Sequence, residues 1–159
     1  EVDAAIRLSR VAPDDVVAVS IGQIGYGAYA TAAIAAEYGA RPAAQWPILA
    51  LPVGWEHFPT MAWLATQTET PRIVGRFDTM MSLAEAAAAG LGVGLLPRMS
   101  VAQARGLVEL ELPSAIGTSE IQLHYHPDLR DDARVRALVR AVRFEARERR
   151  NLMLKGIKA

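Results

Sequence analysis

Residues 76–97, RFDTMMSLAEAAAAGLGVGLLP, predict a strand end, a helix and a second strand within one short segment. Asp78 and Thr79 carry short oxygen-bearing side chains that accept hydrogen bonds from the free amide groups of a helix start. Apolar residues then recur at helical spacing, namely Met80, Leu83, Ala84, Ala87 and Leu91. Gly90 suits the left-handed conformation that ends a helix, and Val93 opens a buried strand. Such a helix start also favours a bound anion, although capping is the commoner use of these residues.

The composition is that of a soluble globular protein, with 159 residues of which 52% are apolar and 21% charged. This length buries one ordinary core or two small lobes. Seventeen basic and seventeen acidic residues cancel, which argues against nucleic-acid binding through a basic surface. The chain has no cysteine, which excludes disulfides and thiolate chemistry and fits a cytoplasmic protein. No secretion signal or long apolar run is present in the sequence, so we expect no membrane association.

Strands and helices alternate along the rest of the chain. Extended segments are predicted at residues 3–8, 16–21, 46–51, 72–77, 107–112 and 120–126, and helices at 31–38, 59–66 and 98–105. This order favours an α/β architecture with mainly parallel strands. In such sheets ligands bind beyond the carboxyl ends of the strands, which is where Thr79 is expected to lie.

The last predicted helix has two distinct faces. Its apolar residues are Val135, Leu138, Val139, Val142 and Ala146, and its arginines are Arg136, Arg140, Arg143, Arg147 and Arg150. Acidic residues are interleaved with these arginines, namely Asp131, Asp132, Glu145 and Glu148. We therefore interpret the arginines as a solvated helix face and not as a nucleic-acid site.

Other polar residues are candidates for catalysis and metal binding. His124 and His126 share a strand face, but no cysteine or third ligand accompanies them, so we expect no metal and no cofactor. The loop residues Trp55, Glu56 and His57 either border a cleft or cover the core. No G-x-S-x-G, phosphate loop or H-E-x-x-H motif occurs, and this predicts that the protein is not an enzyme.

Three segments resemble the effector-binding domain of LysR-type bacterial transcriptional regulators. They are DAAIRL at 3–8, the segment at 76–97 with its "aGlGia-LP" ending, and HPDLRDDARVRALV at 126–139. The resemblance implies a two-lobe periplasmic-binding-protein-like (type 2) fold with mainly parallel sheets flanked by helices. Residues 1–22 and 109–159 would form lobe I, and residues 23–108 would form lobe II.

Two parts of that family's pattern are missing from the sequence. The winged helix-turn-helix that reads DNA is absent, and so are the strand, helix, strand and helix that would precede Asp3. The resemblance therefore implies an incomplete lobe I and DNA contact only through a missing N-terminal domain. It also implies a homo-oligomer in the full-length protein.

The same resemblance implies a small-molecule effector, an organic acid or aromatic compound, bound between the lobes. Its expected contacts are Arg7, Ser9, Gln23, Tyr26, Asp78 and Thr79. The alternative is a solute-binding protein of a transport system, which has the same fold. The missing signal peptide and the HPDLR segment favour the regulator.

Overall fold

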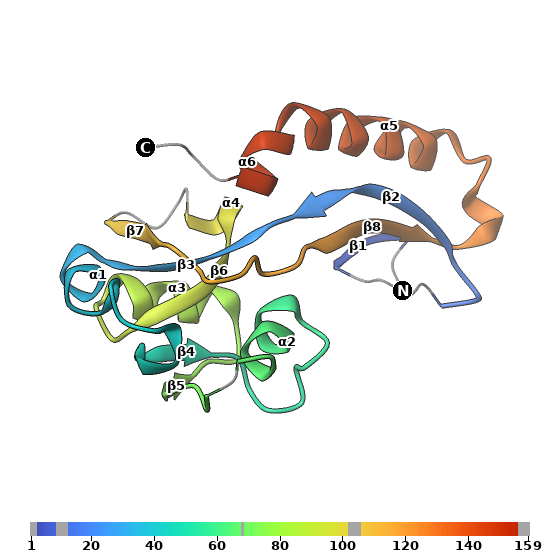
Figure 1. The fold of residues 1–159 in the computed structure, drawn as a ribbon. Helices are drawn as coiled ribbons and strands as arrows, with labels where there is room; N and C mark the ends of the chain where they lie inside the picture. The colour runs from blue at the N-terminus through green and yellow to red at the C-terminus, as the bar shows by residue number, and fades with distance from the viewer. Residues whose placement is uncertain (1–2, 9–12, 68, 102–105, 156–159) are drawn as a thin grey trace.

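The computed structural model describes residues 3–8, 13–67, 69–101 and 106–155. Its strands form two sheets (Figure 1). Sheet A has the strand order β1-β8-β2, with β1 at Ala4–Leu8, β2 at Val17–Ile24 and β8 at Ser119–Tyr125. Both of its pairings are antiparallel. Sheet A is therefore built from chain segments that lie far apart in the sequence.

Sheet B has the order β5-β4-β6-β3-β7. Its strands are β3 (Tyr26–Thr31), β4 (Ile48–Ala50), β5 (Ile73–Arg76), β6 (Val93–Pro97) and β7 (Leu107–Leu110). Strand β4 pairs in parallel with β5 and β6, whereas β3 pairs antiparallel with β6 and β7. The predicted α/β class is confirmed, but the expectation of mainly parallel strands is wrong. Only β4, β5 and β6 are joined by the helical crossovers that parallel neighbours need, because β3 enters sheet B directly from β2.

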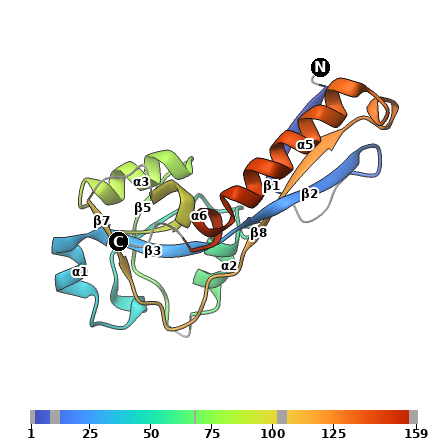
Figure 2. The same ribbon diagram turned by 90° about the horizontal axis from the view of Figure 1, so that it is seen from above.

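The helices flank these sheets. They are α1 (Ala32–Tyr38), α2 (Pro59–Ala65), α3 (Met80–Ala88), α4 (Arg98–Val101), α5 (Ala133–Glu148) and α6 (Arg150–Lys155). Short 3-10 turns occur at Ala43–Gln45 and Pro127–Leu129. Helices α1 and α3 pack on sheet B, α5 lies along sheet A, and α6 contacts both α4 and β2 (Figure 2). The helix predicted at 98–105 begins as expected, and its last four residues lie outside the described part.

The predicted helix boundaries around α1 and α3 are confirmed. The Thr31 hydroxyl accepts a hydrogen bond from the Ile34 amide at 3.4 Å, and the Thr79 hydroxyl accepts one from the Ser82 amide at 3.0 Å. Gly90 has φ +78°, the left-handed conformation expected at the end of α3. These caps satisfy amides that the helices leave unpaired, so both helix starts are fixed by local sequence.

The buried core is unevenly divided between the two sheets. Sheet B and its helices bury the large side chains of Trp46, Ile48, Leu49, Leu83, Leu95 and Leu96. Under α5, sheet A has a cluster of only three buried residues, which are Leu123, Tyr125 and Val135. Ile6 and Leu8 on the edge strand β1 are 59% and 43% exposed. Most of the hydrophobic stabilisation therefore comes from sheet B.

Asp132 begins α5 as its N-cap. Its Oδ1 atom accepts from the amides of Arg134 at 2.7 Å and Val135 at 3.4 Å, and the Arg134 Nη2 atom donates to Oδ2 at 3.0 Å. Hydrogen bonds from the Arg134 side chain and backbone lower the pKa of the Asp132 carboxyl to about 2 from its ordinary 3.8. The unfolded chain therefore binds this proton more readily than the folded chain does.

Because the folded pKa of Asp132 is the lower one, its contribution to stability should be present above about pH 4 and lost as the pH falls towards about 2. The Asp132→Asn variant should lose less stability over that interval than the wild type, and urea unfolding between about pH 2 and 6 measures the difference. The exposed neighbour Asp131 provides the control, since Asp131→Asn leaves the cap intact. Identical slopes for the wild type and the Asp132→Asn variant would contradict this account.

Candidate ligand-binding site

The carboxyl ends of β4, β5 and β6 and the start of β3 meet at one edge of sheet B. Leu51 follows β4, residues 77–79 follow β5, and Pro97 at the end of β6 pairs with Tyr26 of β3. The Arg76 Nη1 atom donates to the Leu51 carbonyl at 2.6 Å and so joins the ends of β4 and β5. This is the strand edge at which a ligand is expected in α/β proteins.

Thr79 lies at this edge as the N-cap of α3, and both it and Asp78 are exposed. Besides accepting from the Ser82 amide, the Thr79 hydroxyl is 2.8 Å from the Ser82 hydroxyl oxygen. The predicted capping role is therefore confirmed. Contact between Thr79 and a ligand stays a prediction.

Tyr26 is 2% exposed and lies where the chain crosses from sheet A to sheet B. Its hydroxyl is 2.8 Å from the Oγ atom of Ser119, the first residue of β8. This hydrogen bond joins the β2–β3 crossing to the segment that leads from β7 to β8. Burial raises the pKa of the Tyr26 phenol, and the bond with Ser119 opposes that shift. The phenol therefore stays protonated and able to donate at neutral pH.

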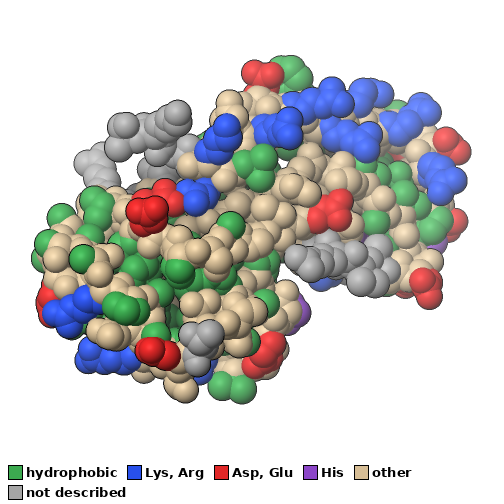
Figure 3. All heavy atoms as spheres, viewed as in Figure 1, with side chains coloured by type: hydrophobic (Ala, Val, Ile, Leu, Met, Phe, Trp, Pro, Cys, Tyr) green, Lys and Arg blue, Asp and Glu red, His purple; other side chains and the backbone are tan. Residues whose placement is uncertain are grey.

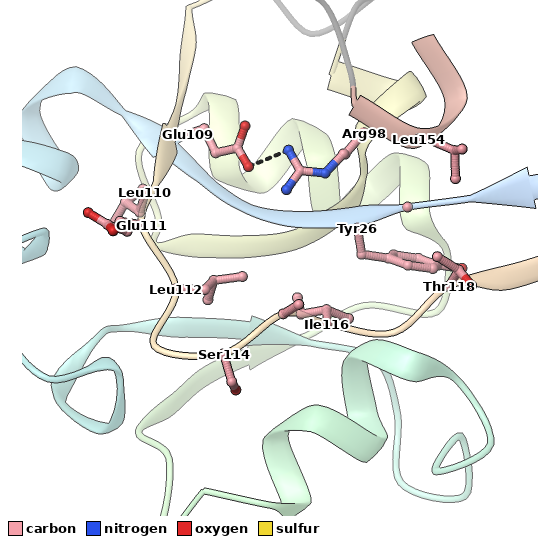
Figure 4. A pocket seen from close by; sticks show the side chains of 12 residues that line it. Tyr26, Arg98, Glu109, Leu110, Glu111, Leu112, Ser114, Ile116, Thr118 and Leu154 are labelled. Carbon is pink, nitrogen blue, oxygen red and sulfur yellow. Dashed lines mark hydrogen bonds and ion pairs between the residues drawn. The ribbon is translucent and has the colours of Figure 1, made fainter. Parts of the chain in front are cut away.

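A cavity of about 660 Å³ opens beside Tyr26 (Figure 4). It lies between β3, β7 and the segment 111–118 that leads back to β8. Its polar side chains include Tyr26, Arg98, Glu109, Glu111, Ser114 and Thr118, and its apolar ones include Leu112, Ile116 and Leu154. An apolar pocket with a few converging polar groups is the usual form of a small-molecule site.

Arg98 and Glu109 form an ion pair at the upper rim of this cavity (Figure 4). Arg98 Nη1 also donates to the Tyr29 hydroxyl at 3.4 Å. Burial, followed by the nearby Glu109 carboxylate, raises the pKa of Tyr29 to about 12. Sequence reasoning missed this group, because only the pairing of Tyr29 with Glu109 across β3 and β7 brings the residues together.

The six residues expected at the site do not share one cavity. Tyr26 lines the cavity described above, whereas Gln23 lines a second cavity of about 290 Å³ beside α5 and α6. Arg7 is exposed on β1 opposite Gln122 of β8, and Arg7, Asp78 and Thr79 line neither cavity. Ser9 lies outside the described residues.

The two histidines considered for metal binding lie in different surroundings. His124 is 5% exposed and its Nε2 atom is 2.9 Å from Gln122 Oε1. His126 follows β8, and its Nδ1 atom accepts from the Asp128 amide at 3.3 Å. Within the part of the chain that the structure describes, no three His, Asp or Glu side chains are grouped to hold a metal ion.

The aromatic loop after β4 packs on itself. Trp55 and Phe58 are half-buried, and the ring centroids of Trp55 lie 5.2 Å from Phe58 and 6.1 Å from His57. In the space-filling view a notch separates the part of the molecule that holds α2 from the part that holds β1 (Figure 3). The loop therefore belongs to the side of the molecule that carries α2, with part of its surface open to solvent.

Comparison with known families decides the identity of the fold. A model of the LysR substrate binding domain matches residues 1–147. The chain belongs to the LysR substrate-binding domain family. The predicted type 2 periplasmic-binding-protein-like fold is thereby confirmed, and the domain is an effector-binding domain of a transcriptional regulator family. A search of curated protein sequences finds no match.

Solved structures of LysR-type regulators have the same fold. The regulatory domain of CrgA from Neisseria meningitidis matches with a TM-score of 0.71 and 16% identity, covering 91% of this chain and 75% of that one. The AmpR effector-binding domain from Citrobacter freundii matches with 0.70 and 20%, covering 92% and 75%. Full-length LysG from Corynebacterium glutamicum, solved with its effector Arg bound, matches with 0.62 and 21%, covering 91% and 51%. Among the described residues of this LysR domain, no helix is long and apolar enough to cross a membrane.

Proposed function

We propose that this LysR domain senses a small organic acid or aromatic effector and controls DNA binding by a winged helix-turn-helix that lies outside this chain. The observation that carries the proposal is the 660 Å³ cavity at the point where both crossing segments pass between sheets A and B. Membership of an effector-binding family supports it. The alternative, a solute-binding protein of a transport system, has no comparable observation in its favour.

In this proposal sheet A belongs to lobe I, formed by residues 1–22 and 109–159, and sheet B to lobe II, formed by residues 23–108. Two crossings join them, at β2–β3 and at the segment between β7 and β8. A ligand shifts such an equilibrium only by its different affinity for the two lobe arrangements. The bond between Tyr26 and Ser119 joins the crossings and is therefore placed to respond to closure. The full-length protein would act as a homo-oligomer.

We further propose that the start of α3 binds the acidic group of the effector. Helix amides and the Thr79 hydroxyl lie together at the edge of sheet B, and the positive end of the helix dipole favours an anion. Asp78, which precedes Thr79, would also contact the effector. Arg7 and Ser9 from lobe I, with Gln23 and Tyr26 from the crossing, would complete the site after closure. No catalytic step is part of this function.

Replacing Thr79 by alanine should weaken effector binding, because a hydrogen bond to a charged ligand contributes about 1.5–3 kcal/mol. Loss of the cap should also lower the free energy of unfolding by about 0.5–2 kcal/mol. The measurement is calorimetry with an organic acid that raises the melting temperature of the wild-type domain. Thr79→Ser keeps the hydroxyl and is the matched control. Equal affinities for wild type and the folded alanine variant would limit Thr79 to a capping role.

A further inference from the structure

The second cavity lies where β2 meets the junction of α5 and α6. Its volume is about 290 Å³, and Gln23, Arg147 and Arg150 line it together with an apolar wall. That wall includes Ile21, Ala146 and Met153. Two arginines and a glutamine thus border an apolar hollow, a combination that suits a ligand with one anionic and one apolar end.

Backbone contacts hold this cavity in place. The Gly25 amide donates to the Met153 carbonyl at 2.9 Å and fastens α6 to the crossing between β2 and β3. A register shift between Ser20 and Gly22 bends β2 beside the cavity. Gly22 lies close to α5 and α6 at this point. A Cβ atom added to it would lie 3.4 Å from the terminal methyl of Met153 and 3.8 Å from the Cβ atom of Ala146. The backbone of β2 and the contact between Gly25 and Met153 therefore fix one side of the hollow.

The arginines at this cavity are separated from the acidic residues of α5. At 3.6 residues per turn, Arg136, Arg140, Arg143 and Arg147 project within an arc of about 60°, whereas Glu145 and Glu148 point about 110° or more from its centre. Two carboxylates at α5 pair elsewhere, since the N-cap Asp132 binds Arg134 and Glu145 binds Arg149. No ion pair is found for Arg147 or Arg150 among the described residues. Basic side chains accordingly gather along α5 (Figure 3).

We propose that this cavity is a second binding site of the domain, for a small organic carboxylate with an apolar tail. Arg147 and Arg150 hold the carboxylate by charge-assisted hydrogen bonds, and Gln23 donates a further one. The tail lies on the apolar wall. With a water molecule occupying about 30 Å³ of liquid volume, the cavity accommodates an acid of about six carbon atoms. The other arginines of α5 steer the anion towards the site.

A ligand at this site would lie beside the helix that contacts elements of both sheets. Helix α6 contacts β2 of sheet A and α4, which continues from β6 of sheet B. A ligand held between β2, α5 and α6 therefore strengthens the contact that joins the two halves. Gln23 is the one residue proposed for both this site and the effector site. The two arginines that supply the charge here are not part of the effector site, and Asp78 and Thr79 do not line this cavity.

The test uses hexanoate as the probe, followed by titration calorimetry and amide chemical shifts at low salt, where charge interactions are least screened. Saturable binding is expected, with shifts on β2, α5 and α6. The double variant R147Q/R150Q should bind at least about tenfold more weakly. The matched control R134Q/R149Q removes the same charge from arginines already paired with carboxylates, and should stay within about twofold of wild type. Ala146→Leu fills the hollow without changing charge and should also abolish binding.

Several results would overturn the site. One is a lack of saturation by hexanoate up to about 20 mM, a concentration well above the Kd of a weak small-molecule site. Another is an equal loss of affinity in the R147Q/R150Q and R134Q/R149Q variants, which would mean that net charge alone attracts the anion. Inorganic phosphate binding as tightly as hexanoate would exclude a role for the apolar wall. Shifts confined to Tyr26 and Thr79 would place the acid in the effector site instead.

Discussion

Replacing Gly92 by alanine is expected to lower the free energy of unfolding by about 3 kcal/mol or more, as overpacking does when the neighbour is rigid. A Cβ atom at this position would lie 2.2 Å from the Pro47 carbonyl oxygen. The two backbones are held together because the Val93 amide donates to that same oxygen at 2.8 Å. Since β6 and the chain entering β4 must both shift, the damage should reach the centre of sheet B. Urea unfolding monitored by circular dichroism measures it.

Gly117→Ala is the matched control for the Gly92 variant. A Cβ atom there would have its nearest neighbour at 3.9 Å, the Cβ atom of Pro59, which is an ordinary contact. Its free energy of unfolding should stay within about 0.5 kcal/mol of wild type. Similar losses in the two variants would show that the close approach of Gly92 to Pro47 does not govern stability.

Hydrogen exchange should separate the two sheets. Amides of the sheet B core between Ile73 and Leu96 are expected to exchange at least about 100-fold more slowly than those at residues 4–8 and 121–125, after correction for intrinsic rates. That ratio corresponds to about 2.7 kcal/mol of difference in opening free energy. The physical reason is the small buried cluster under α5 and the exposure of Ile6 and Leu8 on β1.

Dilute protein should be used for this exchange experiment, because a second chain pairing with the β1 edge would protect sheet A. Uniform protection of both sheets at low concentration would contradict the division of stability. It would mean that contacts around sheet A contribute more than its three-residue buried cluster indicates.

Local signals in the sequence were sufficient to predict the α3 region. The Thr79 cap, the apolar spacing of α3 and the left-handed Gly90 each depend on residues within a few positions of one another. The final helix was predicted for the same reason, since its apolar face repeats at helical spacing. The family resemblance, which rests on the order of such segments, is confirmed over residues 1–147.

The direction of the strands and the position of the cavities could not be predicted from local sequence signals. Whether β3 runs parallel or antiparallel to β6 depends on how the chain crosses between sheets, and no local pattern encodes that. Arg98 and Glu109 are paired only because β7 returns beside β3. The cavity that Gln23 lines likewise exists only because α5 and α6, which lie more than a hundred residues later in the sequence, line it too.

In the proposed function, an effector bound between the lobes changes their separation. Because the chain has no cysteine, single cysteines introduced at the exposed positions Ile6 and His57 allow two spin labels to be attached selectively. One label would report on β1 of sheet A and the other on the loop after β4 of sheet B. The distance between them should be measured by pulsed electron resonance with and without an organic acid that raises the melting temperature. A shorter distance is expected with the acid, and less shortening in the Thr79→Ala variant at the same acid concentration, because that variant binds the acid more weakly. An unchanged distance in the acid-saturated wild-type protein would contradict it.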